Sequence, residues 1–257
     1  MTRVLSGVVL AAAALAAIIL LPVSALRWVA CGIAALAAYE YVTVAGAGPA
    51  RSIPLLIPVV VAACLLSSGF GFTVDPMVVV VAAFAWVAVE VLFLGRSIQH
   101  AGAALFAPLY IGVPLGMLVV IQATFGWRAT LLLIATIVVS DSAQYYSGRT
   151  LGRRPLAPSI SPKKTIEGAV GGVLFGTIFV VVAGPRLFPA VALPWVWVGL
   201  TVVVLGICGD LFESRLKRAA GVKDSSALIP GHGGVLDRID ALLFAIPAFY
   251  LFLRAAA

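Results

Sequence analysis

The sequence alternates long runs of apolar residues with short breaks rich in polar residues, glycine and proline. The runs are about 20 residues long, enough for a helix to cross the roughly 30 Å hydrocarbon core of a membrane. They lack the period-two alternation of apolar and polar residues found in strands of a membrane barrel. The pattern therefore predicts nine membrane-spanning helices, near residues 4–22, 27–46, 53–71, 76–95, 102–121, 128–147, 168–185, 194–213 and 234–254.

The overall composition agrees with this pattern. Of the 257 residues, 63% are hydrophobic, whereas about half of a soluble globular domain is apolar. We therefore expect an all-α integral membrane protein. Its first helix should be retained rather than cleaved as a signal peptide, because further apolar runs follow it. The three cysteines lie in apolar runs and are odd in number, which predicts small buried side chains rather than disulfides or a zinc site.

The net charge of +7 does not indicate a nucleic-acid partner, because the basic residues lie in short loops where membrane topology accounts for them. With nine spans, 13 of the 17 basic residues fall on one side of the membrane. Since Lys and Arg are enriched in cytoplasmic loops, the N-terminus is expected inside and the C-terminus outside. The prediction is a multi-pass protein of the cell membrane whose two long polar loops face the cytoplasm.

Charge also divides the chain into two regions. Eighteen of the 27 charged residues lie between positions 141 and 240, and only eight lie in the first 140. We expect a five-span scaffold over residues 1–127, which also offers a surface for homodimer contacts, and a four-span catalytic region over 128–257. Glu40 and Glu90 fall within scaffold spans. Because each lies near a helix end, a structural role is favoured over a functional one.

The densest group of charges extends from Ser214 to Asp240. If the eighth span continues as a helix, Asp210, Ser214 and Lys217 stand at i, i+4 and i+7 on one face. Glu213 is also spaced to pair with Lys217. One helix face therefore offers an acid, a hydroxyl and a cation at the membrane surface, although a solvated helix end with salt bridges would give the same pattern.

A turn of sequence P-G-H-G-G precedes the ninth span. Its glycines allow backbone N–H groups to approach an anion closely. The ninth span then opens with Asp237 and Asp240 on one helical face. Asp210 and Asp237 can face each other from the ends of neighbouring helices. Such a pair suits Mg²⁺, which takes one or two carboxylates together with substrate phosphates.

Two upstream segments carry further candidates. Asp141 lies in the last turns of the sixth span, where it either pairs with an arginine such as Arg149 or binds metal or nucleotide at the mouth of a site. The next loop, S-P-K-K-T-I-E-G, places Lys163 and Lys164 just before a helix N-terminus. These lysines would either cradle a polyphosphate or hold anionic lipid headgroups.

The run S-x-L-K-R-x4-K-D-x-S-x2-I-P-x-H-G-G-V-x-D-R-I-D, from Ser214 to Asp240, resembles the signature of the phosphatidate cytidylyltransferases, also called CDP-diacylglycerol synthases. The segments D-S-A-Q-Y-Y-S-G-R-T-L-G and S-P-K-K-T-I-E-G resemble upstream segments of that family in the same order. Two residues depart from the pattern. Gln144 stands where a small residue is expected, and Ile166 stands where an aromatic residue is common.

The resemblance implies Mg²⁺-dependent condensation of phosphatidic acid with CTP, giving CDP-diacylglycerol and pyrophosphate. It assigns the metal to Asp210 and Asp237, with a monovalent cation such as K⁺ beside them. The catalytic set it implies is Lys217, Arg218, Lys223, Asp224, Arg238 and Asp240. The substrate-binding set it implies is Asp141, Tyr145, Lys163, Lys164, Ser214, His232, Gly233 and Gly234.

Two other functions fit parts of the pattern. The first is nucleotidyl- or glycosyl-phosphate transfer to another lipid phosphate. The second is a lipid transporter, which would place charges near the membrane midplane in both halves. The charges of this chain instead gather in one half and at one predicted face, which favours an enzyme acting on phosphates.

Overall fold

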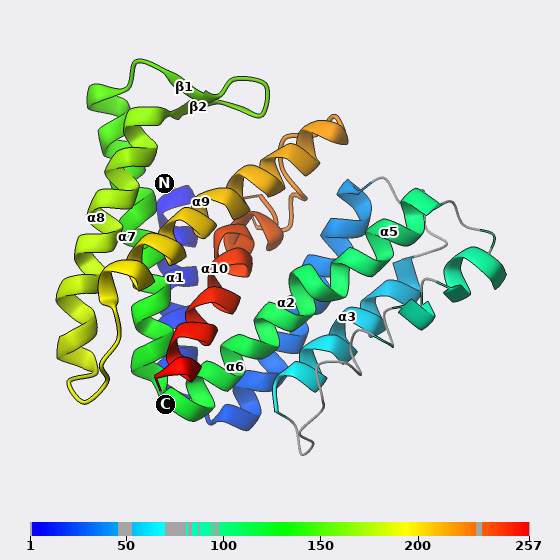
Figure 1. Ribbon diagram of the computed structural model, residues 1–257. Helices are drawn as coiled ribbons and strands as arrows, with labels where there is room; N and C mark the ends of the chain where they lie inside the picture. Colours follow the sequence, from blue (N-terminus) through cyan, green and yellow to red (C-terminus); the bar gives the residue numbers. More distant parts are fainter. Residues whose placement is uncertain are drawn as a thin grey trace.

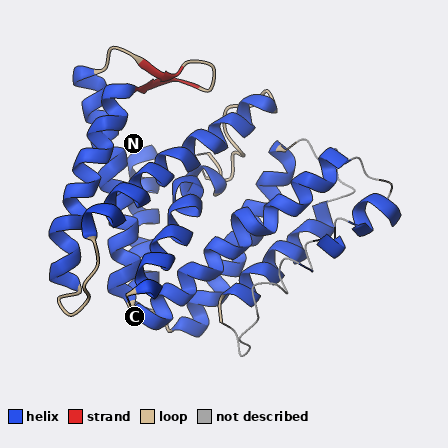
Figure 2. Cartoon of the chain, in the orientation of Figure 1, coloured by secondary structure: helices blue, strands red, loops and turns tan. Residues whose placement is uncertain are grey.

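The computed structural model describes residues 2–45, 53–69, 81, 84–86, 88–93, 95, 98–229 and 233–256. Most of these residues are helical, and a single small hairpin projects from one end (Figure 1, Figure 2). The elements, in chain order, are α1 (Thr2–Leu20), α2 (Val23–Val44), α3 (Ile53–Ser67), η1 (Val89–Phe93), α5 (Ile98–Ala107), η2 (Pro108–Gly112), α6 (Val113–Phe125), α7 (Trp127–Leu151), β1 (Pro155–Ala157), β2 (Ser161–Thr165), α8 (Ile166–Leu187), α9 (Trp195–Ala219) and α10 (Leu236–Ala255).

The helices coincide with the predicted spans wherever the structure describes them. Eight of the nine spans overlap an α-helix, and the fourth, near 76–95, is described only in part and overlaps the short π-helix η1. Among the described residues, five helices are long and apolar enough to cross a membrane: Val23–Val44, Leu105–Phe125, Trp127–Leu151, Ile166–Leu187 and Trp195–Ala219. The helical class and the presence of membrane-spanning helices are thus confirmed, while the number nine and the orientation stay predictions.

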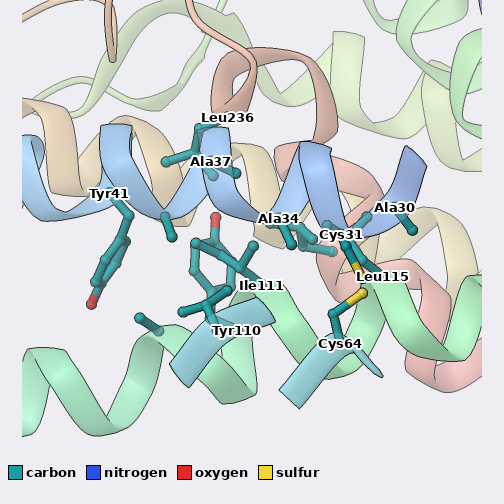
Figure 3. Packing of buried hydrophobic residues seen from close by; sticks show 14 of the residues in the cluster. Ala30, Cys31, Ala34, Ala37, Tyr41, Cys64, Tyr110, Ile111, Leu115 and Leu236 are labelled. Atoms are coloured by element: carbon teal, nitrogen blue, oxygen red, sulfur yellow. The ribbon is translucent and has the colours of Figure 1, made fainter. Parts of the chain in front are cut away.

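Helices α3, α5, η2 and α6 pack against α2. Ala30, Ala34, Ala37 and Ala38 are all buried there, in the same core cluster as Tyr110 and Ile111 of η2 and Leu115 of α6 (Figure 3). Small side chains at these spacings let helix backbones approach closely, as is typical of membrane interfaces. Cys31 and Cys64 are buried as predicted, whereas Cys208 is exposed on α9.

The second half packs α7, α8, α9 and α10 around another core, with Leu133, Val202 and Phe249 at its centre. Helix α10, red in Figure 1, contacts α9 and α7 on one side and α6 and α2 on the other. It therefore connects the second half of the chain with the first, and its first turns carry the predicted acidic residues Asp237 and Asp240.

A two-stranded antiparallel hairpin, β1 and β2, lies between α7 and α8. It was not predicted, because three prolines within residues 155–162 indicate a loop and the strands are too short to show an alternating pattern. Helix α8 then begins at Ile166, where the Thr165 hydroxyl accepts a hydrogen bond from the Gly168 amide at 3.1 Å. Threonine is a favoured N-cap residue, so the helix start has a local cause.

Candidate functional site

The predicted site segments meet at one end of the helices. The hairpin, the end of α9, the loop after it and the start of α10 all lie at this end of the molecule (Figure 1). Both α7 and α9 continue as helices well past their apolar parts, through the polar sequences that end at Leu151 and Ala219. The structure therefore brings the hairpin that follows α7 to the polar end of α9, although these two stretches are distant in the sequence.

Asp210 of α9 carries the contact between these stretches. Its Oδ2 forms an ion pair with Lys164 of β2, and the Ser214 hydroxyl donates to its Oδ1 over a long 3.4 Å. The Asp210 side chain is 29% exposed and that of Lys164 is 23% exposed. The carboxylate is thus open to solutes on one side, with one oxygen only weakly bonded.

Lys217 lies about two turns further along α9 than Asp210, in a more enclosed setting. Its ammonium forms ion pairs with Glu213, the predicted i, i+4 partner, and with Asp237 of α10. The Glu213 and Asp237 side chains are 1% and 5% exposed, and that of Lys217 is 12% exposed. Because charges withdrawn from water require partners, these three groups depend on one another.

The second oxygen of Asp237 organises the loop before α10. It accepts hydrogen bonds from the backbone and hydroxyl of Ser225, at 3.0 and 2.9 Å, and from the Gly234 amide at 2.7 Å. The glycine turn does bring an amide to an anion, as predicted, but in this structure that anion is Asp237. Gly233 closes the turn, since its carbonyl accepts from Ile229 at 2.8 Å.

Asp141 and Asp240 approach the same region from α7 and α10. Both interact electrostatically with Asp210. Gly209 allows this approach, because a Cβ at that position would stand 2.5 Å from the Asp240 carbonyl oxygen. The Asp141 carboxylate accepts from Gln144 at 3.0 Å rather than pairing with Arg149, which lies about 12 Å along the helix.

The other predicted residues lie around this centre. Arg149 donates instead to the Tyr145 hydroxyl at 3.1 Å. The Arg218 guanidinium donates to two carbonyls, that of Ile160 in the hairpin turn at 3.2 Å and that of Val222 at 3.0 Å. Four more candidates are exposed at this end: Lys163, Lys223, Asp224 and Arg238. His232 lies outside the described residues.

Sequence reasoning missed the contribution of Glu40. This carboxylate, only 1% exposed, reaches from α2 to the loop before α10, where it accepts hydrogen bonds from Ser225, Ser226, Val235 and Leu236. The available signal was a single acid within an apolar run. That signal indicates a buried partner but does not identify one that lies 185 or more residues away.

We name the seven charged side chains described above the charged cluster: Asp141, Lys164, Asp210, Glu213, Lys217, Asp237 and Asp240. Its five carboxylates outnumber its two ammonium groups, so a cation would lower their mutual repulsion. Within the described part of the chain, no three acidic, histidine or cysteine side chains converge into a complete metal site. The donor set fits an ion such as Mg²⁺, which completes its shell with waters and phosphates.

Comparison with known proteins places this arrangement in a family. A protein from Escherichia coli K12 with no assigned activity, YnbB, is 46% identical over 129 residues, covering 50% of this chain and 43% of its own length. Phosphatidate cytidylyltransferase from Aquifex aeolicus is 44% identical over 125 residues, covering 49% and 47%. The Bacillus subtilis phosphatidate cytidylyltransferase is 36% identical over 162 residues, covering 61% and 60%.

The matched part of the chain thus spans about half the length of these curated relatives. The family model described as the cytidylyltransferase family matches much more, from residue 1 to residue 256. With the predicted motifs brought together at one end of a helical membrane protein, the chain belongs to the cytidylyltransferase family.

Proposed function

We propose that this chain transfers the cytidylyl group of CTP to phosphatidic acid, forming CDP-diacylglycerol and pyrophosphate. The observation that carries the proposal is the Lys164–Asp210 ion pair, which joins the lysine loop to the acidic end of α9 in a chain of the cytidylyltransferase family. Two of the relatives are named phosphatidate cytidylyltransferases, which supports the choice of lipid.

In this proposal the basic residues hold the two polyanionic substrates in line. Lys164 exchanges Asp210 for a substrate phosphate, and Lys217 does the same with Asp237. The exposed Lys163, Lys223 and Arg238 lie at the same end to receive the triphosphate. Because the lipid phosphate is already an anion, the protein's task is to position and neutralise rather than to form a covalent intermediate.

The reaction then needs one bond to form and one to break. A lipid phosphate oxygen attacks the α-phosphorus of CTP, and the bond from that phosphorus to the oxygen bridging to the β-phosphate breaks. The electron pair leaves with pyrophosphate. Lysines close to these oxygens stabilise the charge that develops in the transition state.

We further propose that Mg²⁺, with a monovalent cation such as K⁺ beside it, binds at the charged cluster. Asp210 fits best, since its Oδ1 has only the long contact with Ser214. Asp237 would contribute Oδ1 after Lys217 turns away, because its Oδ2 already accepts three hydrogen bonds. When bound, the ion would draw phosphate oxygens to the carboxylates and neutralise charge on them.

A groove in the apolar part of the protein supports a lipid substrate. It has a volume of about 230 Å³ and is lined by Phe106, Leu109, Tyr110, Leu243, Phe244 and Pro247. The last three lie on α10 at three, four and seven residues after Asp240, on the same helical face. An acyl chain in this groove would leave its phosphate beside the charged cluster.

The membrane arrangement that we propose has nine spans, with the N-terminus and the charged cluster on the cytoplasmic side and the C-terminus outside. The distribution of basic residues supports it. We also propose a homodimer formed through the scaffold, where α2 offers exposed Trp28 and Tyr39 to lipid or to a second copy. Labelling of single cysteines from each side of the membrane tests the topology, and light scattering in detergent tests the dimer.

The activity is tested by incubating the purified protein with labelled CTP, phosphatidic acid and Mg²⁺ in detergent. We expect labelled CDP-diacylglycerol and an equal amount of pyrophosphate. Parallel reactions with polyprenyl phosphate, or with nucleotide sugars in place of CTP, test the other lipid-phosphate transfers. A folded sample that forms product only in those reactions, or in none, would refute the proposal.

A further inference from the structure

The carboxylate of Glu40 binds both ends of the segment that precedes α10. Its Oε1 accepts hydrogen bonds from the Ser226 hydroxyl at 2.6 Å and the Val235 amide at 2.9 Å. Its Oε2 accepts from the Ser225 hydroxyl at 3.0 Å and the Leu236 amide at 2.7 Å. A carboxylate that only accepts is suited to four such donors, so the group is fully bonded despite its burial.

Two of these bonds complete the start of α10. The N-cap residue of this helix is Val235, which has no side chain able to cap it. The first amides of a helix lack partners within the helix, and a negative charge near them is favourable. Glu40 supplies both the acceptors and the charge from α2, so α10 begins at Leu236 through a contact with the scaffold.

The other bonds connect Glu40 to the charged cluster. The Ser225 hydroxyl lies 3.0 Å from Glu40 Oε2 and 2.9 Å from Asp237 Oδ2. Because a hydroxyl has a single proton to donate, the two carboxylates share this one donor. Gly234 leaves the space for this arrangement, since a Cβ there would overlap the Ser225 hydroxyl and the Glu40 carboxylate. Asp237 in turn pairs with Lys217. A continuous series of contacts therefore joins α2 to the lysine of α9.

We propose that Glu40 is a positioning residue for the phosphate site: it fixes Ser225 and Ser226 against the start of α10 at residues 235–236 and, through Ser225, sets the orientation of Asp237 and Lys217. The proposal rests on the proposed function for its catalytic consequence. The proposal gives a residue of the predicted scaffold a role in the site, whereas the sequence pattern favoured a structural role for Glu40. A purely structural role for Glu40 would affect folding without a selective effect on turnover or on the start of α10.

The test compares Glu40→Gln with a matched control, Gln122→Met. Gln122 is also a buried polar residue of the first half, and its amide donates to the Ile18 carbonyl at 2.8 Å, away from the charged cluster. We expect Glu40→Gln to lower kcat by about 10- to 100-fold, with a smaller change in the KM for CTP, as for residues that orient catalytic ligands. Gln122→Met should keep the wild-type kcat.

Hydrogen exchange gives a readout that does not depend on activity. In Glu40→Gln the amides of Val235 and Leu236 should exchange at least about 10-fold faster, while those of α7 and α8 keep their rates. Glu40→Asp keeps the charge but is one methylene shorter, so it should be intermediate in both measurements. If Glu40→Gln does not fold, Ser225→Ala replaces it, because that change removes only the hydroxyl that connects Glu40 with Asp237.

The outcomes separate the two proposals. A wild-type protein that forms no CDP-lipid refutes the proposed function, and the exchange rates alone then decide the role of Glu40. An active wild type supports that function whatever the variants do.

The positioning role is refuted if folded Glu40→Gln keeps wild-type kcat and exchange rates, or if it resembles Gln122→Met in both. A double variant Glu40→Gln/Ser225→Ala no worse than the single variants supports coupling through Ser225, and full additivity refutes it.

Discussion

Asp210 and Asp237 are equivalent in the sequence, where each is an acid at the end of an apolar helix, but they differ in the structure. Asp210 is 29% exposed and pairs with Lys164, which is distant from it in the sequence. Asp237 is 5% exposed, pairs with Lys217 and accepts three further hydrogen bonds. Exposure and hydrogen bonding therefore suggest different principal roles, reaction at Asp210 and organisation of the site at Asp237.

The largest effect should come from Asp210→Asn. The substitution keeps the shape but removes the negative charge that we propose holds the metal ion, so kcat for CDP-lipid formation should fall by about 10²- to 10³-fold. The unfolding temperature in detergent should hardly change, because the lost ion pair is partly exposed. Turnover at saturating substrates, with thermal unfolding of the same sample, provides the measurement.

Glu167→Gln is the matched control for Asp210→Asn. Glu167 is a carboxylate at the same end of the molecule, where it accepts from the backbone amides of Arg153 and Arg154 at 3.0 and 3.2 Å. Its loss should leave kcat within a few-fold of the wild type. Near-wild-type turnover by Asp210→Asn would remove Asp210 from the site and end the comparison.

Asp237→Asn should instead lose stability along with activity. An asparagine has one oxygen where the loop and Lys217 require two acceptors, so buried donors and a buried ammonium lose their partner. Such a change costs about 3–5 kcal/mol, and unfolding in detergent at increasing denaturant measures it. If Asp237→Asn unfolds like the wild type, then Asp237 does not organise the site and the two acids are equivalent.

Gly234→Ala tests the packing around Asp237 without changing any charge. The new methyl group would overlap the Ser225 hydroxyl and the Glu40 carboxylate, which are both held by other bonds. Overpacking of this kind costs about 1–3 kcal/mol. Gly32→Ala, on α2, is the control for space, because nothing lies within 4 Å of a Cβ there and Gly32 is not among the glycines with positive φ. Equal stability of the two variants would show that the site tolerates displacement of Glu40.

Much of the fold could be predicted because apolar runs of the length of a membrane determine where helices lie. The stripe of Asp210, Ser214 and Lys217 could also be predicted, since helical spacing places these residues on one face. The pairing of Glu213 with Lys217 follows from the same rule and is confirmed.

The remaining features depend on contacts between distant residues. The Lys164–Asp210 pair requires the hairpin, which was not predicted because three prolines indicate a loop there. The position of Glu40 requires the packing of α2 beside α10, which no local pattern encodes. The different roles of Asp210 and Asp237 depend on which of the two carboxylates accepts hydrogen bonds from loop amides. Those hydrogen bonds form only when the loop before α10 is folded.

The smallest effect that sharpens the comparison is the stability change caused by removing Lys164, measured against the removal of Lys217. Lys164→Met should lower the free energy of unfolding by less than about 1 kcal/mol, because its ion pair is partly exposed. The difference should shrink further as salt rises from 0.05 to about 0.5 M, since salt screens exposed charges. Lys217→Met leaves Glu213 and Asp237 buried side by side without a cation, which should cost about 3–5 kcal/mol with little dependence on salt. Equal losses, or equal salt dependence, would mean that the two ion pairs share one environment, and the different roles assigned to Asp210 and Asp237 would lose their physical basis.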